Sequence, residues 1–382
     1  MLEGMKKAKR QGLRTWIEID TKAIAANYRA FRQLLPREIK MMGVVKSNAY
    51  GHNITEFAEV LEKLGIDMLA VDSLVEALAL RKARVKTPIL VLGYTLPKML
   101  SKAAGKNIHL TISSVGGLRI FLKEPFEKKI PIHLKVDTGM HRQGFLPEDQ
   151  NQVLAVLSRT KGLRVEGLYT HFAIAKDPQD RKFTRLQLTE FEKWREALAA
   201  AGFAPIAHAG ATGGALVFPE AHFDMVRVGI GLYGIWPSGE TRRAYVAKIS
   251  LQPVLSWKTL VSEIKEIPKG SSVGYDRTHE TARATKIAVC PAGYWHGYPR
   301  VLSNNAEVVV CGMRAPILGR VSMDMIVIDV TDVPSIKVGD EVTLIGREGK
   351  EEVSADEIAV RAGTSAYEIL TRLNPLIKRV YR

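Results

Sequence analysis

Short apolar segments alternate with longer amphipathic segments through the first two thirds of the chain. The apolar segments are typical of buried strands, and the segments between them have the spacing of helices. The predicted strands are 40–45, 68–71, 88–93, 108–112, 131–136, 163–170, 205–209 and 225–229. The predicted helices include Thr21–Leu35, Thr55–Leu64, Leu74–Ala83, Gln150–Leu157 and Thr184–Ala201. Eight strands in one uninterrupted series favour a closed TIM-type (β/α)8 barrel over an open sheet.

The pattern changes after about residue 240, where β-branched segments alternate with Gly, Pro and Asp turns. The segments 248–265, 285–290, 306–310, 324–330 and 340–345 indicate a mostly β domain. Ser354, followed three residues later by Glu357, has the spacing of a capping box and predicts the start of a helix. The predicted organisation is a basic tail (1–14), a barrel domain (15–243) and a C-terminal β domain (244–382).

Polar residues gather at the carboxyl ends of the predicted barrel strands. They are Lys46, Lys135, Asp137, Arg142, His171, His208 and Arg227, the last of which leads into Gly229. In a TIM barrel the loops that follow the strands build the active site, because all strands end on the same face. The sequence therefore predicts a site made of these side chains.

Lys46 follows the apolar run Met41–Val45 and allows two interpretations. Its stem could leave the core so that the amine reaches solvent. Alternatively, the amine is desolvated, which lowers the pKa of a lysine and makes it a nucleophile or a base. Spacing alone does not separate the two.

Composition narrows the class of protein. With 46% apolar and 25% charged residues among 382, the chain has the composition of an ordinary globular protein. It has no apolar run of the length that a membrane helix requires and no apolar secretory segment near its N-terminus, so we expect a cytoplasmic protein without a membrane partner. The two cysteines, Cys290 and Cys311, have neither metal-binding nor redox spacing.

The net charge of +15 raises nucleic acid as a partner. The basic residues are spread along the whole chain, however, and no helix-turn-helix or aromatic-interleaved basic motif stands out. We therefore expect no nucleic-acid partner; the alternative predicts strongly salt-dependent binding of DNA or RNA.

The polar residues together match the needs of pyridoxal 5'-phosphate (PLP), which are a lysine amine, donors for a phosphate and a cation for a ring nitrogen. Tyr50 offers a hydroxyl, and Thr212–Gly214 and Gly229–Gly231 offer backbone amides where barrels bind phosphate. The alternative for these glycines is turn geometry alone.

Eight motifs resemble, in order, the signatures of alanine racemases. They are VVKSNAYGH, HLKVDTGMHRQGF, GLYTHFA, RVGIGLYG, SSVGYDR, PAGYWHGYPR, GRVSMDM and TSAYEIL. The match extends from about Thr15 to the C-terminus. The resemblance implies a PLP-dependent homodimer with shared active sites that interconverts L- and D-alanine and supplies D-alanine for peptidoglycan.

The resemblance also implies a pair of catalytic residues. Lys46 would bind PLP as a Schiff base and act on one face of the α-carbon, and Tyr275 would act on the other face from the partner subunit. Racemisation requires removal of a proton on one face and its return on the other. His171 would hydrogen-bond Tyr275, and Arg227 would meet the pyridine nitrogen. Because a guanidinium does not readily release a proton, Arg227 would weaken electron withdrawal and favour racemisation over decarboxylation.

Other positions take their roles from the same resemblance. The implied cofactor-binding residues are Lys46, Tyr50, Arg142, His171, His208, Thr212, Arg227, Gly229, Ile230 and Tyr367. Arg142, Met323 and Asp324 would bind the substrate carboxylate, while Tyr294 and Arg300 would line the entrance. Lys135 matches a lysine that many members carry carbamylated. Tyr367 also fits a plain structural role, because its spacing to Leu370 and Leu373 is that of a buried helix face.

Some positions depart from the family pattern. Gly210, Ala211, Thr212 and Gly213 stand where the family has Ala-Asn-Ser-Ala, and Ser47 replaces an alanine. His141 and Gln143 replace a glycine and a leucine around Arg142. These changes lie near the site, where they could alter cofactor affinity or substrate range. One alternative is a serine or broad-specificity racemase, since a small pocket rejects one extra hydroxyl only weakly. Another is a PLP carrier, which would resemble the barrel alone, whereas this chain keeps Tyr275, Met323 and Asp324 in a second domain.

Overall fold

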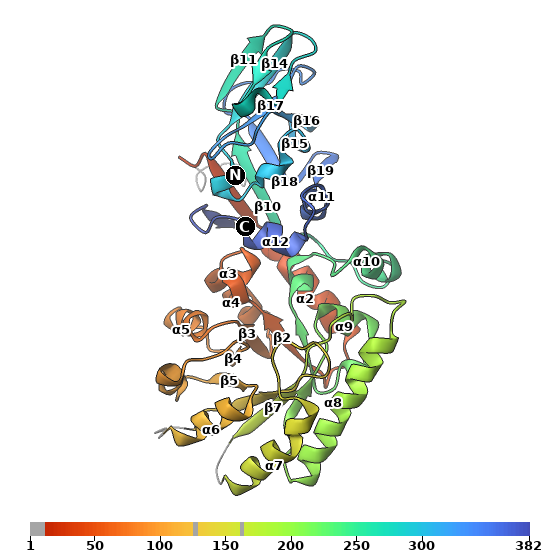
Figure 1. Cartoon of the computed structure of the whole chain (residues 1–382). Coiled ribbons are helices and arrows are strands. Elements are labelled where there is room, and N and C mark those ends of the chain that lie inside the picture. The colour runs from red at the N-terminus through yellow and green to blue at the C-terminus, as the bar shows by residue number, and fades with distance from the viewer. Residues whose placement is uncertain (1–11, 125–128, 161–163) are drawn as a thin grey trace. The chain divides into compact units, whose positions relative to one another are not determined.

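Eight parallel strands form a barrel-like sheet, in the order β8-β7-β6-β5-β4-β3-β2-β9 (Figure 1). Its strands are β2 (Lys40–Val44), β3 (Met68–Val71), β4 (Ile89–Val91), β5 (Ile108–Ile112), β6 (Ile132–Lys135), β7 (Val165–Tyr169), β8 (Ile206–His208) and β9 (Met225–Val228). Each predicted strand is present, with bounds that differ by at most two residues. The end strands β8 and β9 approach through backbone hydrogen bonds from Asp224 to Ala207 (3.1 Å) and from Arg227 to Gly210 (2.9 Å), which nearly close the barrel. The predicted barrel fold is confirmed.

Helices cover the outside of the barrel, and most of them bury one apolar face against it. They are α2 (Thr21–Leu34), α4 (Ile54–Lys63), α5 (Leu74–Lys82), α6 (Val115–Lys123), α7 (Gln150–Arg159), α8 (Lys182–Ala200), α9 (Thr212–Val217) and α10 (Gly239–Tyr245). The long helix α8 illustrates the pattern, since Leu188, Phe191, Trp194 and Leu198 recur at helical spacing and are buried.

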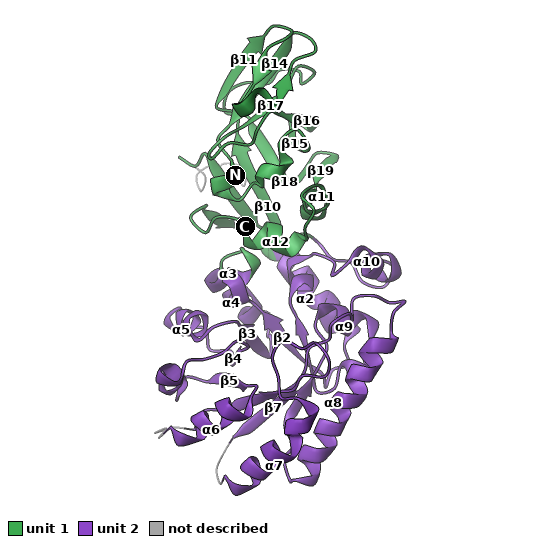
Figure 2. Ribbon diagram, viewed as in Figure 1, with its two compact units in different colours: residues 1–21, 50–53, 253–382 green, residues 22–49, 54–252 purple. Residues whose placement is uncertain are grey.

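The structure is a computed structural model that describes residues 12–124, 129–160 and 164–382. The chain divides into two compact units, which Figure 2 colours separately. The barrel unit contains residues 22–49 and 54–252, and the β unit contains residues 50–53, 253–382 and the described residues up to Thr21. The predicted domain limits of 15–243 and 244–382 stay a prediction. Most of the predicted basic tail lies outside the described residues.

Ten strands form the main sheet of the β unit. They are β1 (Thr15–Ile19), β10 (Leu255–Leu260), β11 (Glu263–Ile267), β14 (Thr285–Cys290), β15 (Glu307–Val310), β16 (Met313–Leu318), β17 (Ile326–Asp329), β18 (Glu341–Glu348), β19 (Glu351–Val353) and β20 (Arg379–Tyr381). A small hairpin of β12 (Ser272–Val273) and β13 (His279–Glu280) and the helices α11 (Ala355–Arg361) and α12 (Ala366–Thr371) complete the unit. Strand β1 pairs with β10 and β20, so segments from both ends of the chain share one sheet.

Several features of this sheet differ from the prediction, which did not include strands β1, β16, β19 and β20. The segment 248–265 is not one strand, since β10 and β11 are separate strands with different partners, β18 and β14. Strand β16 was not predicted, and it contains Pro316, which cannot donate a backbone hydrogen bond. The proline is tolerated because β17 pairs only with Ile317 and Leu318 of this strand.

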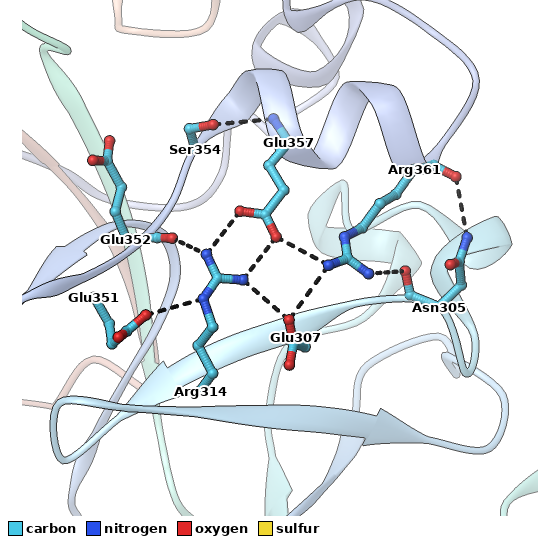
Figure 3. A network of polar contacts seen from close by, with 8 residues as sticks. All are labelled: Asn305, Glu307, Arg314, Glu351, Glu352, Ser354, Glu357 and Arg361. Carbon is cyan, nitrogen blue, oxygen red and sulfur yellow. Dashed lines mark hydrogen bonds and ion pairs between the residues drawn. The ribbon is translucent and has the colours of Figure 1, made fainter.

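Helix α11 begins directly after its N-cap, Ser354, as predicted. The Ser354 hydroxyl oxygen accepts a hydrogen bond from the Glu357 amide (3.0 Å; Figure 3). The second half of the predicted capping box is replaced by another contact. The Glu357 carboxylate binds the Arg314 guanidinium at 2.8 and 3.0 Å, and Glu307 and Arg361 join the same network. These ion pairs connect α11 to strands β15 and β16 and stabilise that part of the β unit.

Candidate active site

Lys46 lies two residues beyond strand β2, at the start of the short turn α3 (Lys46–Tyr50). The predicted strand, 40–45, ended one residue closer to it. Ser47, Asn48, Ala49 and Tyr50 all have positive φ between 50° and 56°, so the backbone after the lysine turns in the left-handed sense. Left-handed helical geometry costs about 1–2 kcal/mol per residue for side chains other than glycine. Interactions with the rest of the protein must therefore hold this turn.

Glu76 on helix α5 supplies those interactions. Its Oε1 accepts hydrogen bonds from the amides of Ser47 (2.6 Å) and Asn48 (3.3 Å), and its Oε2 accepts one from Asp72 (2.8 Å). Asn48 adds another contact, since its Oδ1 accepts a hydrogen bond from the Ile54 amide (3.0 Å). The carboxylate thus fixes the backbone that positions Lys46.

Arg227 on β9 is buried and is surrounded by acceptors that carry no formal charge. Its Nη1 donates to the His208 carbonyl (2.8 Å) and lies 3.0 Å from His208 Nδ1. Its Nη2 donates to the carbonyls of Thr170 (2.7 Å) and Ala209 (2.8 Å) and lies 3.3 Å from His171 Nδ1. Burial lowers the pKa of this guanidinium to about 10, so it is charged at neutral pH. Among the described residues its Nε–H has no acceptor and can serve a ligand.

Lys135, the last residue of β6, is buried beside two arginines. Its Nζ donates to Gln143 Oε1 (2.9 Å), and the Gln143 amide donates to Ser113 Oγ (3.3 Å). Burial, followed by the charges of Arg142 and Arg227, lowers the pKa of the Lys135 amine to about 8. The glutamine that departs from the family pattern is therefore a direct partner of Lys135.

Asp137 organises the loop that carries Arg142. Its carboxylate accepts hydrogen bonds from the backbone amides of Gly139 (2.9 Å), Met140 (2.9 Å), His141 (3.0 Å) and Arg142 (3.0 Å). These amide bonds hold the pKa of Asp137 below its usual value even though burial opposes them. His141 has a positive φ of 53°, which the loop requires at that point.

His171, which follows strand β7, is under the electrostatic influence of four cations. Burial, and then the charges of Arg227, Arg142, Lys135 and Lys46, lower the pKa of His171 to about 3. A small pocket beside Arg142 is lined by Lys135, Gln143 and His171. The predicted residues Lys46, Lys135, Arg142, His171, His208 and Arg227 thus lie together in one strongly positive site, which favours anionic ligands.

Thr212 begins helix α9 and connects it to the loop after β9. Its hydroxyl oxygen accepts hydrogen bonds from the amides of Gly229 (3.0 Å) and Gly231 (3.4 Å), which leaves its proton free to be donated. Ala211, at the N-cap, provides no side-chain bond, as its departure from the family pattern predicted. A Cβ at Gly231 would lie 2.5 Å from the Phe31 ring and 2.9 Å from the Thr212 methyl, so this position requires glycine.

Tyr50 and Tyr367 lie close together in the β unit, with ring centroids 6.0 Å apart. Burial raises the pKa of Tyr367 to about 12 and raises that of Tyr50 further, so both hydroxyls keep their protons. Gly51, next in the chain, has a φ of 85°, and a Cβ there would lie 2.1 Å from the Leu370 carbonyl oxygen. The close approach of α12 therefore requires glycine at this position.

Tyr275 projects from a strained turn of the β unit and is 69% exposed. The residues around it, Gly274 and Asp276, have positive φ angles of 74° and 61°. The Asp276 carboxylate forms ion pairs with Arg320 (3.3 Å) and Arg300 (3.8 Å). The turn that presents Tyr275 is thus connected to the predicted entrance residue Arg300.

Tyr294 and Met323 are neighbours in the same unit. The amides of Tyr294 and Trp295 donate to the carbonyls of Ser322 (3.0 Å) and Met323 (2.9 Å). Apolar side chains in this part of the unit are exposed: Tyr294, Trp295, Met323 and Met325. Asp324 follows in the same loop and is also exposed.

Sequence reasoning assigned no role to three residues that the site uses. Glu76 supports the turn after Lys46, and its only signal in the sequence was a capping box with Ser73. Tyr169 stacks on His208 (4.9 Å between ring centroids) and lies under the Arg227 guanidinium (5.3 Å). His133 hydrogen-bonds His208, and both His133 and Tyr169 lie inside motifs that had been noted for other residues.

A barrel with a lysine and several cations at the carboxyl ends of its strands, followed by a β unit, defines a two-domain α/β-barrel enzyme with a site for anions. Residues 19–237 match the family profile "Alanine racemase, N-terminal domain", and residues 254–381 match "Alanine racemase, C-terminal domain". The chain therefore belongs to the alanine racemase family, which confirms the predicted resemblance.

Similar proteins cover nearly the whole chain. The alanine racemase of Methanococcus maripaludis is 38% identical over 96% of this chain and 98% of its own length. The alanine racemase of Symbiobacterium thermophilum is 40% identical over 96% and 97%, respectively. The crystal structure of alanine racemase from Bacillus anthracis with bound L-Ala-P superposes with a TM-score of 0.90 at 34% identity, covering 97% of this chain and 95% of that one. These relatives agree with the predicted racemase activity.

Proposed function

We propose that the protein interconverts L- and D-alanine with PLP as its cofactor. The observation that carries the proposal is the pocket that Lys135, Arg142 and His171 line, with Arg227 3.3 Å from His171 Nδ1 and the charge of Lys46 also acting on His171. The one carboxylate in the adjoining loop, that of Asp137, is engaged by four backbone amides. PLP brings a phosphate and a phenolate, and alanine brings a carboxylate, so cofactor and substrate supply the anions that such a site favours.

The residues present fit PLP. Lys46 would hold it covalently, Arg142 would bind its phenolate oxygen, and the Nε–H of Arg227 would meet its ring nitrogen. The phosphate would be held by Tyr50, Thr212, Gly229, Ile230 and Tyr367. When bound, PLP supplies electron withdrawal at the α-carbon of an attached amino acid, which acidifies its proton.

Arg227 would select the type of reaction. A guanidinium donates hydrogen bonds and does not readily release its proton, so the ring nitrogen opposite it stays unprotonated. Weaker electron withdrawal would still allow proton exchange at the α-carbon while suppressing competing reactions. Although burial lowers the pKa of Arg227 to about 10, the guanidinium stays charged at neutral pH, in agreement with this role.

Two residues would exchange the proton, one on each face of the α-carbon. Lys46 would serve one face, and Tyr275 of the partner subunit would serve the other. Because Arg227 donates toward His171 Nδ1, neutral His171 carries its proton on Nε2, where it can donate to the tyrosine oxygen and support its anionic form.

The exposed apolar group of Tyr294, Trp295, Met323 and Met325 supports a homodimer, because such groups often mark protein interfaces. Met323 and Asp324 would reach the substrate carboxylate in the partner's site, and Tyr294 and Arg300 would line its entrance.

Lys135 would carry a carbamate. As an amine it is repelled by Arg142, and its lowered pKa leaves part of it neutral and able to react with carbon dioxide. A carbamate would replace this repulsion by attraction and orient Arg142. Gln143, whose Oε1 accepts from the Lys135 amine, would then donate from its amide nitrogen to a carbamate oxygen.

In the cell, the protein would act in the cytoplasm and supply D-alanine for peptidoglycan. The described residues contain no helix of the length and apolar character needed to cross a membrane.

The test is a chiral separation of products after the PLP-loaded protein has been incubated with single enantiomers of alanine, serine and other amino acids. We expect alanine to be racemised much faster than the rest. Faster conversion of serine would assign a different racemase to the same fold. Bound PLP without conversion of any amino acid would favour a carrier protein.

A further inference from the structure

Three buried histidines form a continuous hydrogen-bonded chain that ends on Arg227. His109 Nδ1 lies 3.1 Å from His133 Nε2, and His133 Nδ1 lies 2.9 Å from His208 Nε2. His208 Nδ1 lies 3.0 Å from Arg227 Nη1. The chain starts on β5, passes through β6 and β8, and reaches the guanidinium on β9.

The barrel contains a space for the middle member of this chain. His133 on β6 pairs in register with Gly167 on β7. A Cβ at Gly167 would lie 2.1 Å from His133 Nδ1, a distance that no side chain could tolerate. The missing side chain on β7 thus lets the His133 imidazole cross that strand and reach His208 on β8. The position of the His133 ring therefore depends on glycine at position 167.

The guanidinium gives the chain a fixed direction. Arginine has only donors, so the facing His208 Nδ1 must be the acceptor and the His208 proton must sit on Nε2. That proton is donated to His133 Nδ1, and the His133 proton on Nε2 is donated to His109 Nδ1 in the same way. Burial, the largest cause for all three, lowers their pKa values, to about 4 for His109 and further for His133 and His208, so each is neutral.

These three histidines cannot relay protons through Arg227. Reversing the direction of their hydrogen bonds would place a proton on His208 Nδ1, and that N–H would face an N–H of the guanidinium. The three histidines can stabilise a buried cation, because the lone pair of each ring points toward Arg227. In the part of the chain that the structure describes, no carboxylate forms an ion pair with Arg227. At the His109 end of the three histidines, the charges that act on the His109 ring are those of Glu166, Arg164 and Arg81. No group of three or more His, Cys, Asp or Glu side chains among the described residues is placed to hold a metal ion.

We propose that His133 and His109 are positioning residues for Arg227: by accepting the His208 proton in series, they hold the His208 ring so that its Nδ1 lone pair faces the guanidinium. The role of Arg227 rests on the proposed function. The direction of the chain does not, because it can be measured whether or not alanine is racemised.

The test is nitrogen NMR of the PLP-loaded full chain with ¹⁵N-labelled histidine. We expect His109, His133 and His208 to carry a single proton on Nε2 at neutral pH. A proton on Nδ1 of His208, or a doubly protonated ring, would overturn the proposal without any variant.

A set of variants tests the link to the site. His133→Leu should leave the Nε2–H of His208 without its acceptor, displace the His208 nitrogen signals, and lower kcat by about three- to tenfold with little change in KM for alanine, as expected for the loss of one hydrogen bond. His133→Asn, whose Oδ1 can accept from His208, should restore both properties in part. Ile132→Val removes a methylene from the same strand and should leave the His208 signals unchanged. Unaltered His208 signals in His133→Leu would overturn the proposal, while a correct chain in a protein that does not racemise alanine would refute only the proposed function.

Discussion

Lys46 is the residue on which the proposed chemistry depends most directly. Lys46→Ala should abolish the visible absorbance of covalently bound cofactor, because no other amine replaces it at the turn after β2. The measurement is an absorbance spectrum after incubation with PLP and removal of the excess. Lys82→Ala on the exposed part of α5 is the matched control and should keep the spectrum of the parent. Persistence of the absorbance in Lys46→Ala would show that another lysine is the anchor.

Substitution of Tyr275 tests the proposed proton transfer on the second face of the α-carbon. Tyr275→Phe removes only a hydroxyl from a largely exposed side chain, so folding and cofactor absorbance should be unchanged. Racemisation should fall by about 10²–10⁴, the usual contribution of one acid or base, and the two directions should be affected unequally. Initial rates from L- and D-alanine measure this. A variant as active as the parent in both directions would remove Tyr275 from the mechanism.

The turn after Lys46 shows where sequence analysis reaches its limit. Lys46, Arg142, His171, His208 and Arg227 were identified from their places at strand ends and from motifs, because barrel topology brings strand ends together. The left-handed course of the turn was not predicted, since no glycine occupies its strained positions. Its cause is a contact with Glu76, which is 29 residues away from Ser47 and becomes a neighbour only in the folded barrel.

Glu76→Gln tests the support that α5 gives to this turn. An amide can accept on one side but turns N–H groups toward the backbone amides on the other, so we expect a loss of about 1–3 kcal/mol in the free energy of unfolding. PLP affinity should also fall, because the Lys46 backbone loses its fixed course. Urea unfolding and titration with PLP measure the two effects. Glu62→Gln is a control for the substitution itself. Glu62 accepts from the amides of Lys86 and Thr87 (both 2.7 Å) on one oxygen, which a glutamine oxygen can replace, so stability and PLP affinity should both change little. Equal PLP affinity in both variants would contradict the proposed support.

The strands show a similar division between predictable and unpredictable features. The barrel strands were found because each is a short apolar run between turn residues. Strand β16 was missed because Pro316 argues against a strand, and only the register with β17 makes the proline acceptable. The break between β10 and β11 was missed because both strands have the same alternating pattern and differ only in their partners.

The buried histidines link the stability of the molecule to pH. His109, His133, His171 and His208 have lowered pKa values in the folded protein, so they stay neutral while the same residues in the unfolded chain take up protons below about pH 6.5. The unfolded state then binds more protons, and stability must fall as the pH falls from 6.5 toward 4. Each histidine should add a slope of about 1.4 kcal/mol per pH unit well below 6.5. Urea unfolding at several pH values measures the slope, and repetition at high salt separates it from repulsion due to the net charge. A flat profile would contradict the burial of neutral imidazoles.

The proposed sharing of active sites between subunits can be tested in a mixed dimer. If Lys46 and Tyr275 of one site come from different subunits, Lys46→Ala and Tyr275→Phe homodimers should each have little activity, because both of their sites lack one residue. A mixed dimer has one site with both defects and one site with neither. After subunits are exchanged at equal concentrations, about half of the dimers are mixed and about a quarter of the parent activity should return. Activity measured before and after co-refolding of the two variants, with each variant refolded alone as the control, decides the matter. Absence of recovery, in a mixture shown by mass spectrometry to contain mixed dimers, would place both residues of a site in the same chain.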